Sequence, residues 1–177
     1  MKLFAGILGL GTLAAILQGV LGTFLPPRFI PDLGLLLVVA LGLSWRGFAG
    51  GVALAALLGY LTDLLSGSLL GQHVLLRMLV FVAAWMGSRH LSLLGSLPRV
   101  LFVAGLTFAN ALLMALLTLA FAGGPGLAAP ALTGLAPQMF LNALCAGAVA
   151  GLTGRAITLL SDDSARKLRL ETRGIPA

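Results

Sequence analysis

Long apolar runs, separated by short breaks rich in polar residues, proline and glycine, dominate this sequence. An α-helix needs about 20 apolar residues to cross a hydrocarbon core about 30 Å thick. By that measure the chain is an all-α, polytopic membrane protein with one domain, residues 1–160, and a polar tail, residues 161–177. The expected transmembrane helices cover about residues 3–25, 33–45, 48–65, 73–87, 99–121 and 133–160.

The short second segment decides the number of crossings. Residues 33–65 form one apolar stretch that only the residues SWRG at 44–47 interrupt, so the stretch must hold two helices. Lysine and arginine are retained on the cytoplasmic side of membranes. Six crossings with cytoplasmic termini leave only Arg28 outside, whereas five crossings, with residues 33–45 re-entering, misplace only Lys2. The charges therefore favour six crossings and leave five as the alternative.

Composition narrows the classes of function. The chain is 59% hydrophobic and 9% charged, and its net charge of +6 is concentrated in loops and the tail, which indicates membrane orientation and no nucleic-acid partner. The sequence shows no Cys and His cluster with metal spacing, no phosphate-binding loop and no pair of carboxylates within the apolar segments. We therefore expect a protein that is not an enzyme and has no cofactor or metal.

Small residues recur at four-residue spacing, which keeps them on one helix face. In the third segment Gly47, Gly51, Ala55 and Gly59 precede Asp63 on this line, which predicts a seam for close helix packing. The first segment carries Ala5 and Gly9, then Gly11 and Ala15, a pattern typical of a face that docks a helix of another protein. Isolated polar residues are expected to bond across helices: Gln18, Asn110, Gln138 and Asn142.

Asp63 ends the third segment within "GYLTDLLSGSLLGQH", and an intramembrane carboxylate usually faces a partner. Arg77 is about as far from the intervening turn, and His73 lies one helical turn before it, so we predict an Asp63–Arg77 ion pair with His73 nearby. Two other interpretations stay open. Asp63 and His73 cap the turn while Arg77 extends toward the surface, or the group binds a ligand or proton.

The segments "PDLGLLLVVALGLSWRG" and "GYLTDLLSGSLLGQH", within residues 31–77, resemble the rod shape-determining protein MreD family. The resemblance implies a non-enzymatic subunit of the bacterial cell-wall elongation machinery in the inner membrane. Its partner would be MreC and, through MreC, the MreB filaments, RodA and a class B penicillin-binding protein. The resemblance also implies a six-helix fold similar to the substrate-binding subunits of energy-coupling-factor transporters, with Asp32 and Asp63 as characteristic positions without a catalytic role.

That similarity of fold supplies the alternative function, a solute-binding subunit of a vitamin transporter. In such a subunit the small residues Ala5, Gly9 and Ala15 would dock a coupling protein. The outer loops hold few polar or aromatic residues with which to bind a polar vitamin, which favours the scaffold. The sequence leaves open whether the protein forms a homodimer and whether a membrane lipid enters the helix bundle.

Overall fold

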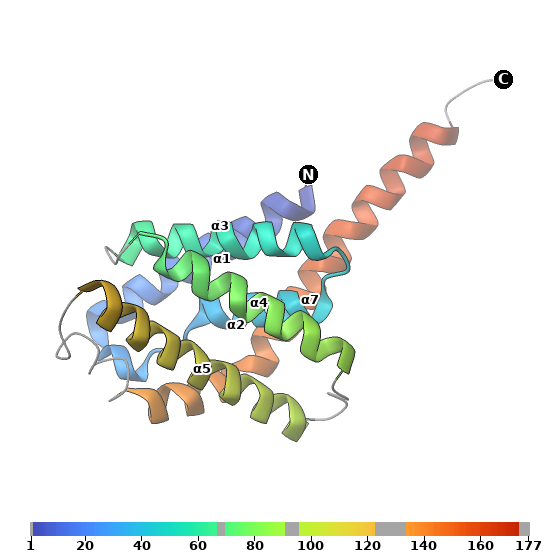
Figure 1. Ribbon diagram of the computed structural model, residues 1–177. Coiled ribbons are helices and arrows are strands. Elements are labelled where there is room, and N and C mark those ends of the chain that lie inside the picture. The colour runs from blue at the N-terminus through green and yellow to red at the C-terminus, as the bar shows by residue number, and fades with distance from the viewer. Residues whose placement is uncertain (1, 67–69, 91–95, 123–133, 174–177) are drawn as a thin grey trace.

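The computed structural model describes residues 2–66, 70–90, 96–122 and 134–173 (Figure 1). In these ranges the chain is helical and contains no strand. A short 3-10 helix, η1, lies between the first two α-helices. The elements are α1 (Lys2–Phe24), η1 (Pro27–Phe29), α2 (Leu33–Ser44), α3 (Phe48–Ser66), α4 (Gln72–His90), α5 (Ser96–Ala122) and α7 (Leu135–Arg173).

Each of the six predicted segments contains an α-helix, and the first three agree with the predicted bounds to within one residue. The last helix differs most, because α7 continues to Arg173 although its apolar part ends near residue 160. Hydropathy marks the end of the apolar part of a helix and not the end of the helix. The segment beyond is rich in Ala, Leu, Lys, Arg and Glu, which favour helix, and it projects from the bundle in Figure 1.

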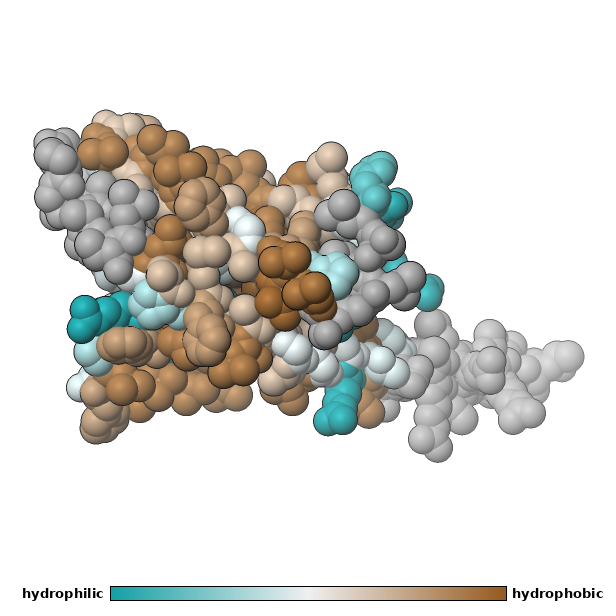
Figure 2. Space-filling model, turned by 90° about the horizontal axis from the view of Figure 1, so that it is seen from below, coloured by the Kyte–Doolittle hydropathy of each residue, from teal (hydrophilic) through white to brown (hydrophobic). Residues whose placement is uncertain are grey.

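Five helical segments of the described chain are long and apolar enough to cross a membrane: Lys2–Phe24, Pro27–Ser44, Phe48–Ser66, Leu97–Phe121 and Leu135–Ser161. Helix α4 does not reach this hydropathy, since it carries His73, Arg77, Arg89 and His90. Hydrophobic side chains cover most of the middle of the face shown in Figure 2, and the strongly hydrophilic ones lie toward its two ends. The protein is therefore a multi-pass α-helical membrane protein.

Helix α2 lies in the centre of the bundle. It has only 12 residues, about 18 Å at 1.5 Å per residue, and every residue from Leu35 to Gly42 is buried. Such a run has no polar face, so the helix needs apolar surroundings on all sides, and here other helices supply them. Its main neighbours are α4 and α7, and the core cluster joins Leu37 and Leu41 to Leu54 of α3 and Phe81 of α4.

The small residues of α3 form the predicted packing seam, and α4 fills it. A Cβ atom on Gly51 would overlap the ring of Phe81, and one on Gly59 would lie 2.6 Å from the carbonyl oxygen of His73. Ala55, between them, is fully buried. Gly47 lies outside the seam, because it is exposed before the start of α3 and its nearest neighbour is the Trp45 side chain.

Of the small residues of α1 that were predicted to dock a helix of another protein, Gly11 packs inside this chain instead. Gly11 is buried, and a Cβ there would overlap the side chain of Leu58 on α3. Ala5 and Gly9 are exposed, and no atom lies within 4 Å of the position of a Cβ on Gly9. Within this chain, Ala5 and Gly9 therefore belong to a free face of α1.

Candidate functional site

The N-terminus of α2 is held by side chains from three parts of the chain. Asp32 is the N-cap residue, and its Oδ1 accepts a hydrogen bond from the backbone N–H of Leu35 at 2.8 Å. The N–H of Asp32 donates to Oδ1 of Asn142 on α7 at 2.7 Å, and the N–H of Gly34 donates to Oε1 of Gln18 on α1 at 3.3 Å. These partners satisfy donors that the start of a helix leaves free.

The same carboxylate neutralises a buried arginine of α4. Nη2 of Arg77 donates to both oxygens of Asp32, at 2.7 and 2.9 Å, and the arginine side chain is only 3% exposed. Gly34 leaves room for this contact, since a Cβ there would lie 3.2 Å from Nη2. Asp32 therefore caps α2 and joins it to α4, while Nε and Nη1 of Arg77 are buried without a hydrogen-bond partner among the described residues.

Asn142 extends this arrangement to α5. Its Nδ2 donates to Oγ1 of Thr107 at 3.2 Å, and the Thr107 hydroxyl donates to the carbonyl of Val103 at 2.9 Å. Both side chains are almost completely buried. We name this set the α2 cap network, which connects five helices through Gln18, Asp32, Arg77, Thr107 and Asn142.

A second polar group closes the hairpin of α3 and α4. Oδ1 of Asp63 lies 2.8 Å from Nδ1 of His73 and accepts the His73 backbone N–H at 3.0 Å. Its Oδ2 accepts the N–H of Gly71 at 2.8 Å and that of Val74 at 3.4 Å. Asp63 is 1% exposed, so the amides that begin α4 and the imidazole replace water around this carboxylate.

The predicted Asp63–Arg77 ion pair is wrong. Arg77 binds Asp32, whereas Asp63 binds His73 and the first amides of α4. Equal distance from a turn places two residues at similar depth but does not direct their side chains toward each other. Asp63 does cap the turn, as one of the other interpretations held, but Arg77 does not extend to the surface.

The role of Asp32 had a signal in the sequence, because an aspartate directly before an apolar helical run is typical of an N-cap. Its pairing with Arg77, 45 residues away, had none. Of the polar residues expected to bond across helices, Gln18 and Asn142 do so. Oδ1 of Asn110 is buried without a partner among the described residues, and the side chain of Gln138 makes no hydrogen bond with them.

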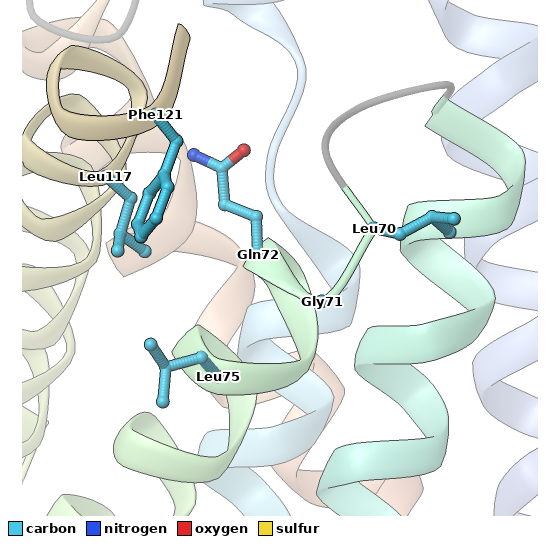
Figure 3. A pocket seen from close by; sticks show the side chains of 6 residues that line it. All are labelled: Leu70, Gly71, Gln72, Leu75, Leu117 and Phe121. Carbon is cyan, nitrogen blue, oxygen red and sulfur yellow. The ribbon is translucent and has the colours of Figure 1, made fainter.

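A cavity of about 360 Å³ lies beside the start of α4 and the end of α5 (Figure 3). The Gln72 side chain extends toward α5, and its Nε2 donates to Oγ1 of Thr118 at 3.1 Å and to the Met114 carbonyl at 3.3 Å. The other side chains of the lining are apolar: Leu70, Leu75, Leu117 and Phe121. No group of three His, Cys, Asp or Glu side chains among the described residues could hold a metal ion.

The fold and these contacts define a multi-pass membrane protein in which Asp32 and Asp63 bind basic side chains of α4. No protein-family model matches the chain, and comparisons with curated proteins and with solved structures find no match either. Any proposal for the function of the protein therefore depends on residues 31–77 and on the contacts that they make.

Proposed function

We propose that the protein is a non-enzymatic scaffold subunit of the bacterial cell-wall elongation machinery, of the MreD type, which binds MreC in the inner membrane. One observation supports this most. In the segment that resembles MreD, Asp32 and Asp63 are engaged within the bundle, as the pairs Asp32–Arg77 and Asp63–His73, whereas Arg46 is exposed. Groups with this role hold helices together, which fits a subunit that works through its surface.

The free face of α1 is the surface that we assign to the partner. Ala5 and Gly9 allow a foreign helix to approach the backbone closely, and Leu13 and Ile16 further along α1 are 64% and 54% exposed. Association of helices in a membrane depends on close packing and on interhelical hydrogen bonds. A transmembrane helix of MreC is the proposed occupant of this face.

The alternative, a solute-binding subunit of a vitamin transporter, would need a pocket with several convergent polar groups. The cavity in Figure 3 is large enough for a small ligand, but Gln72 is the one polar side chain in its described lining, and that amide already binds α5. A second cavity, of about 250 Å³ between α1, α2 and α3, has Gln18, Thr62 and Ser66 in its lining, but Gln18 Oε1 and the Thr62 hydroxyl already bind backbone groups. We take the engagement of these polar groups within the bundle as support for the scaffold over the transporter subunit.

Depletion of the protein from a rod-shaped host tests the proposal. We expect rounded cells and loss of MreC from its complex, and we expect MreC to co-purify with the protein in mild detergent. Gly9→Leu should abolish this capture without unfolding the protein, because the position is open. Gly105→Leu, at an equally open position of α5, is the matched control and should retain MreC.

Cells that keep their shape but require an external vitamin would contradict the scaffold. Purified protein that carries the vitamin together with a coupling protein would then establish the alternative. If Gly9→Leu and Gly105→Leu reduced the capture of MreC equally, the assignment of the partner to α1 would be wrong.

A further inference from the structure

A groove opens between α5 and α7 on the outside of the bundle. Its cavity has a volume of about 440 Å³ and is lined on the α7 side by Phe140, Ala143, Leu144 and Gly147. The spacing from Phe140 to Gly147 is two helical turns, so the lining extends about 10 Å along α7. Gly147 keeps the groove open, because no atom lies within 4 Å of the position of a Cβ on this residue.

Among the described residues that line this groove, Arg99 is the one cation and the others are apolar. The same residue borders a narrow crevice that leads past Val103 and Ala150 to Leu36 and Leu43 of α2. Arg99 is exposed, and it makes no hydrogen bond or ion pair with any described residue. Its guanidinium is therefore free to bind an anion at the mouth of the groove.

The charges around Arg99 favour an anionic occupant. The ends of α2 and α4 and the start of α5 lie at the same end of the bundle (Figure 1), and Arg46, Arg89 and His90 are exposed there. The carboxylates whose side chains the structure describes, Asp32 and Asp63, each bind a basic side chain of α4, Arg77 and His73 respectively. Neither is available to neutralise Arg99.

An apolar groove with a free guanidinium at one end matches a molecule with an anionic head and an apolar tail. Arginine binds phosphate oxygens with two parallel hydrogen bonds, and basic pockets between transmembrane helices bind the head groups of anionic lipids. We propose that this groove binds one anionic phospholipid, with its phosphate on Arg99 and an acyl chain along α7 from Gly147 to Phe140. This site is independent of the face of α1.

Native mass spectrometry of the detergent-purified protein tests the site, with phosphatidylglycerol and phosphatidylcholine as probes. The wild type should retain one phosphatidylglycerol in preference to phosphatidylcholine. Arg99→Gln should reduce that preference by about tenfold, since a hydrogen bond to a charged group is lost. Arg46→Gln removes an exposed cation outside the lining and should leave the preference unchanged.

Gly147→Leu places a side chain in the groove and should reduce retention of both lipids. Gly105→Leu, which is open but outside the lining, should not. Soluble glycerol phosphate should not displace the lipid, because it lacks the acyl chain. Circular dichroism and thermal unfolding would establish that each variant is folded.

Four results would overturn the proposal. They are equal retention of the two lipids by the wild type, equal effects of Arg99→Gln and Arg46→Gln, and displacement by glycerol phosphate, which would indicate a site for free phosphate. The fourth is a Gly147→Leu variant that retains the lipid but no longer binds another protein or a second copy of this chain, which would make the groove a protein interface.

Discussion

At the scale of single residues, two carboxylates that look similar in the sequence have different roles in the structure. Asp32 combines a capping role with a counter-ion role, whereas Asp63 accepts several backbone N–H groups as well as the imidazole. Removing one partner of a buried ion pair leaves an uncompensated charge and costs about 3 to 5 kcal/mol. Asp32 should therefore respond to the loss of Arg77, whereas Asp63 should not.

A double-mutant cycle tests this pairing. Asp32→Asn keeps a capping oxygen but removes the charge, and Arg77→Met removes the cation. Each change should lower the free energy of unfolding in detergent, and the double variant should lose less than the sum of the two. The matched cycle of Asp63→Asn with Arg77→Met should be additive to within about 0.5 kcal/mol. Additivity for Asp32 and Arg77 would contradict the ion pair.

The burial of Asp63 could be predicted from the sequence, because a helix face of small residues leads directly to it. Its partner could not be predicted, because similar depth does not determine which way a side chain points. The cation that faces α2 was identifiable only once α2 was seen to pack against α4.

At the scale of elements, α2 shows how a short apolar helix is stabilised inside a bundle. The position of the helix follows from its apolar run and from the aspartate before it, but its burial on all sides does not, since the other apolar runs look much the same. The polar residues of distant helices stabilise the start of α2 through hydrogen bonds to its first N–H groups. Asn142 contributes most to this, because it binds both the start of α2 and Thr107.

We expect Asn142→Leu to destabilise the protein by about 1 to 3 kcal/mol, because it leaves the partly buried N–H of Asp32 without its hydrogen-bond acceptor. Gln138→Leu, one turn earlier on α7, should change stability by less than about 0.5 kcal/mol, since no hydrogen bond to a described residue is lost. Chemical unfolding in detergent micelles measures both. Equal effects of the two substitutions would show that the amide of Asn142 does not stabilise α2.

The glycines provide a second test at this scale. Gly51→Leu should unfold the protein, because the new side chain would overlap the ring of Phe81, and Gly59→Ala should destabilise it through contact with the backbone of α4. Gly9→Leu should leave the thermal midpoint nearly unchanged, because the position is open. A folded Gly51→Leu variant would mean that α3 and α4 do not pack as closely as described.

At the scale of the whole molecule, helices that follow one another in the chain alternate in direction, and most exposed cations of the described residues lie at one end (Figure 1). The alternation follows from short connections, and the charge asymmetry was visible in the sequence. The central position of α2 could not be predicted, because hydropathy does not distinguish a helix that faces lipid from one that faces only protein. The helical continuation of α7 to Arg173 was not predicted either, because hydropathy marks the end of the apolar part of a helix and not the end of the helix.

Reporter fusions test the orientation that we propose, with both termini in the cytoplasm. A reporter that is active only in the cytoplasm should work after Arg173 and near Ser96, and it should fail near Gly124. The cysteine of a Lys2→Cys variant should be protected from an impermeant thiol reagent added outside the cell. Labelling at that position would favour five crossings with an external N-terminus, and activity near Gly124 would invert the arrangement.

The contact between Asp32 and Asn142 joins residues 110 positions apart in the chain. A ribosome makes α2 well before α7, so the growing protein holds the start of α2 without the Asn142 hydrogen-bond acceptor until α7 has been made. Contacts of such long sequence separation form late, and the intermediates that await them are vulnerable to quality-control proteases. Premature termination before α7 would therefore leave a membrane fragment with an incomplete core, and rapid turnover of that fragment would protect the cell from incomplete copies of the protein.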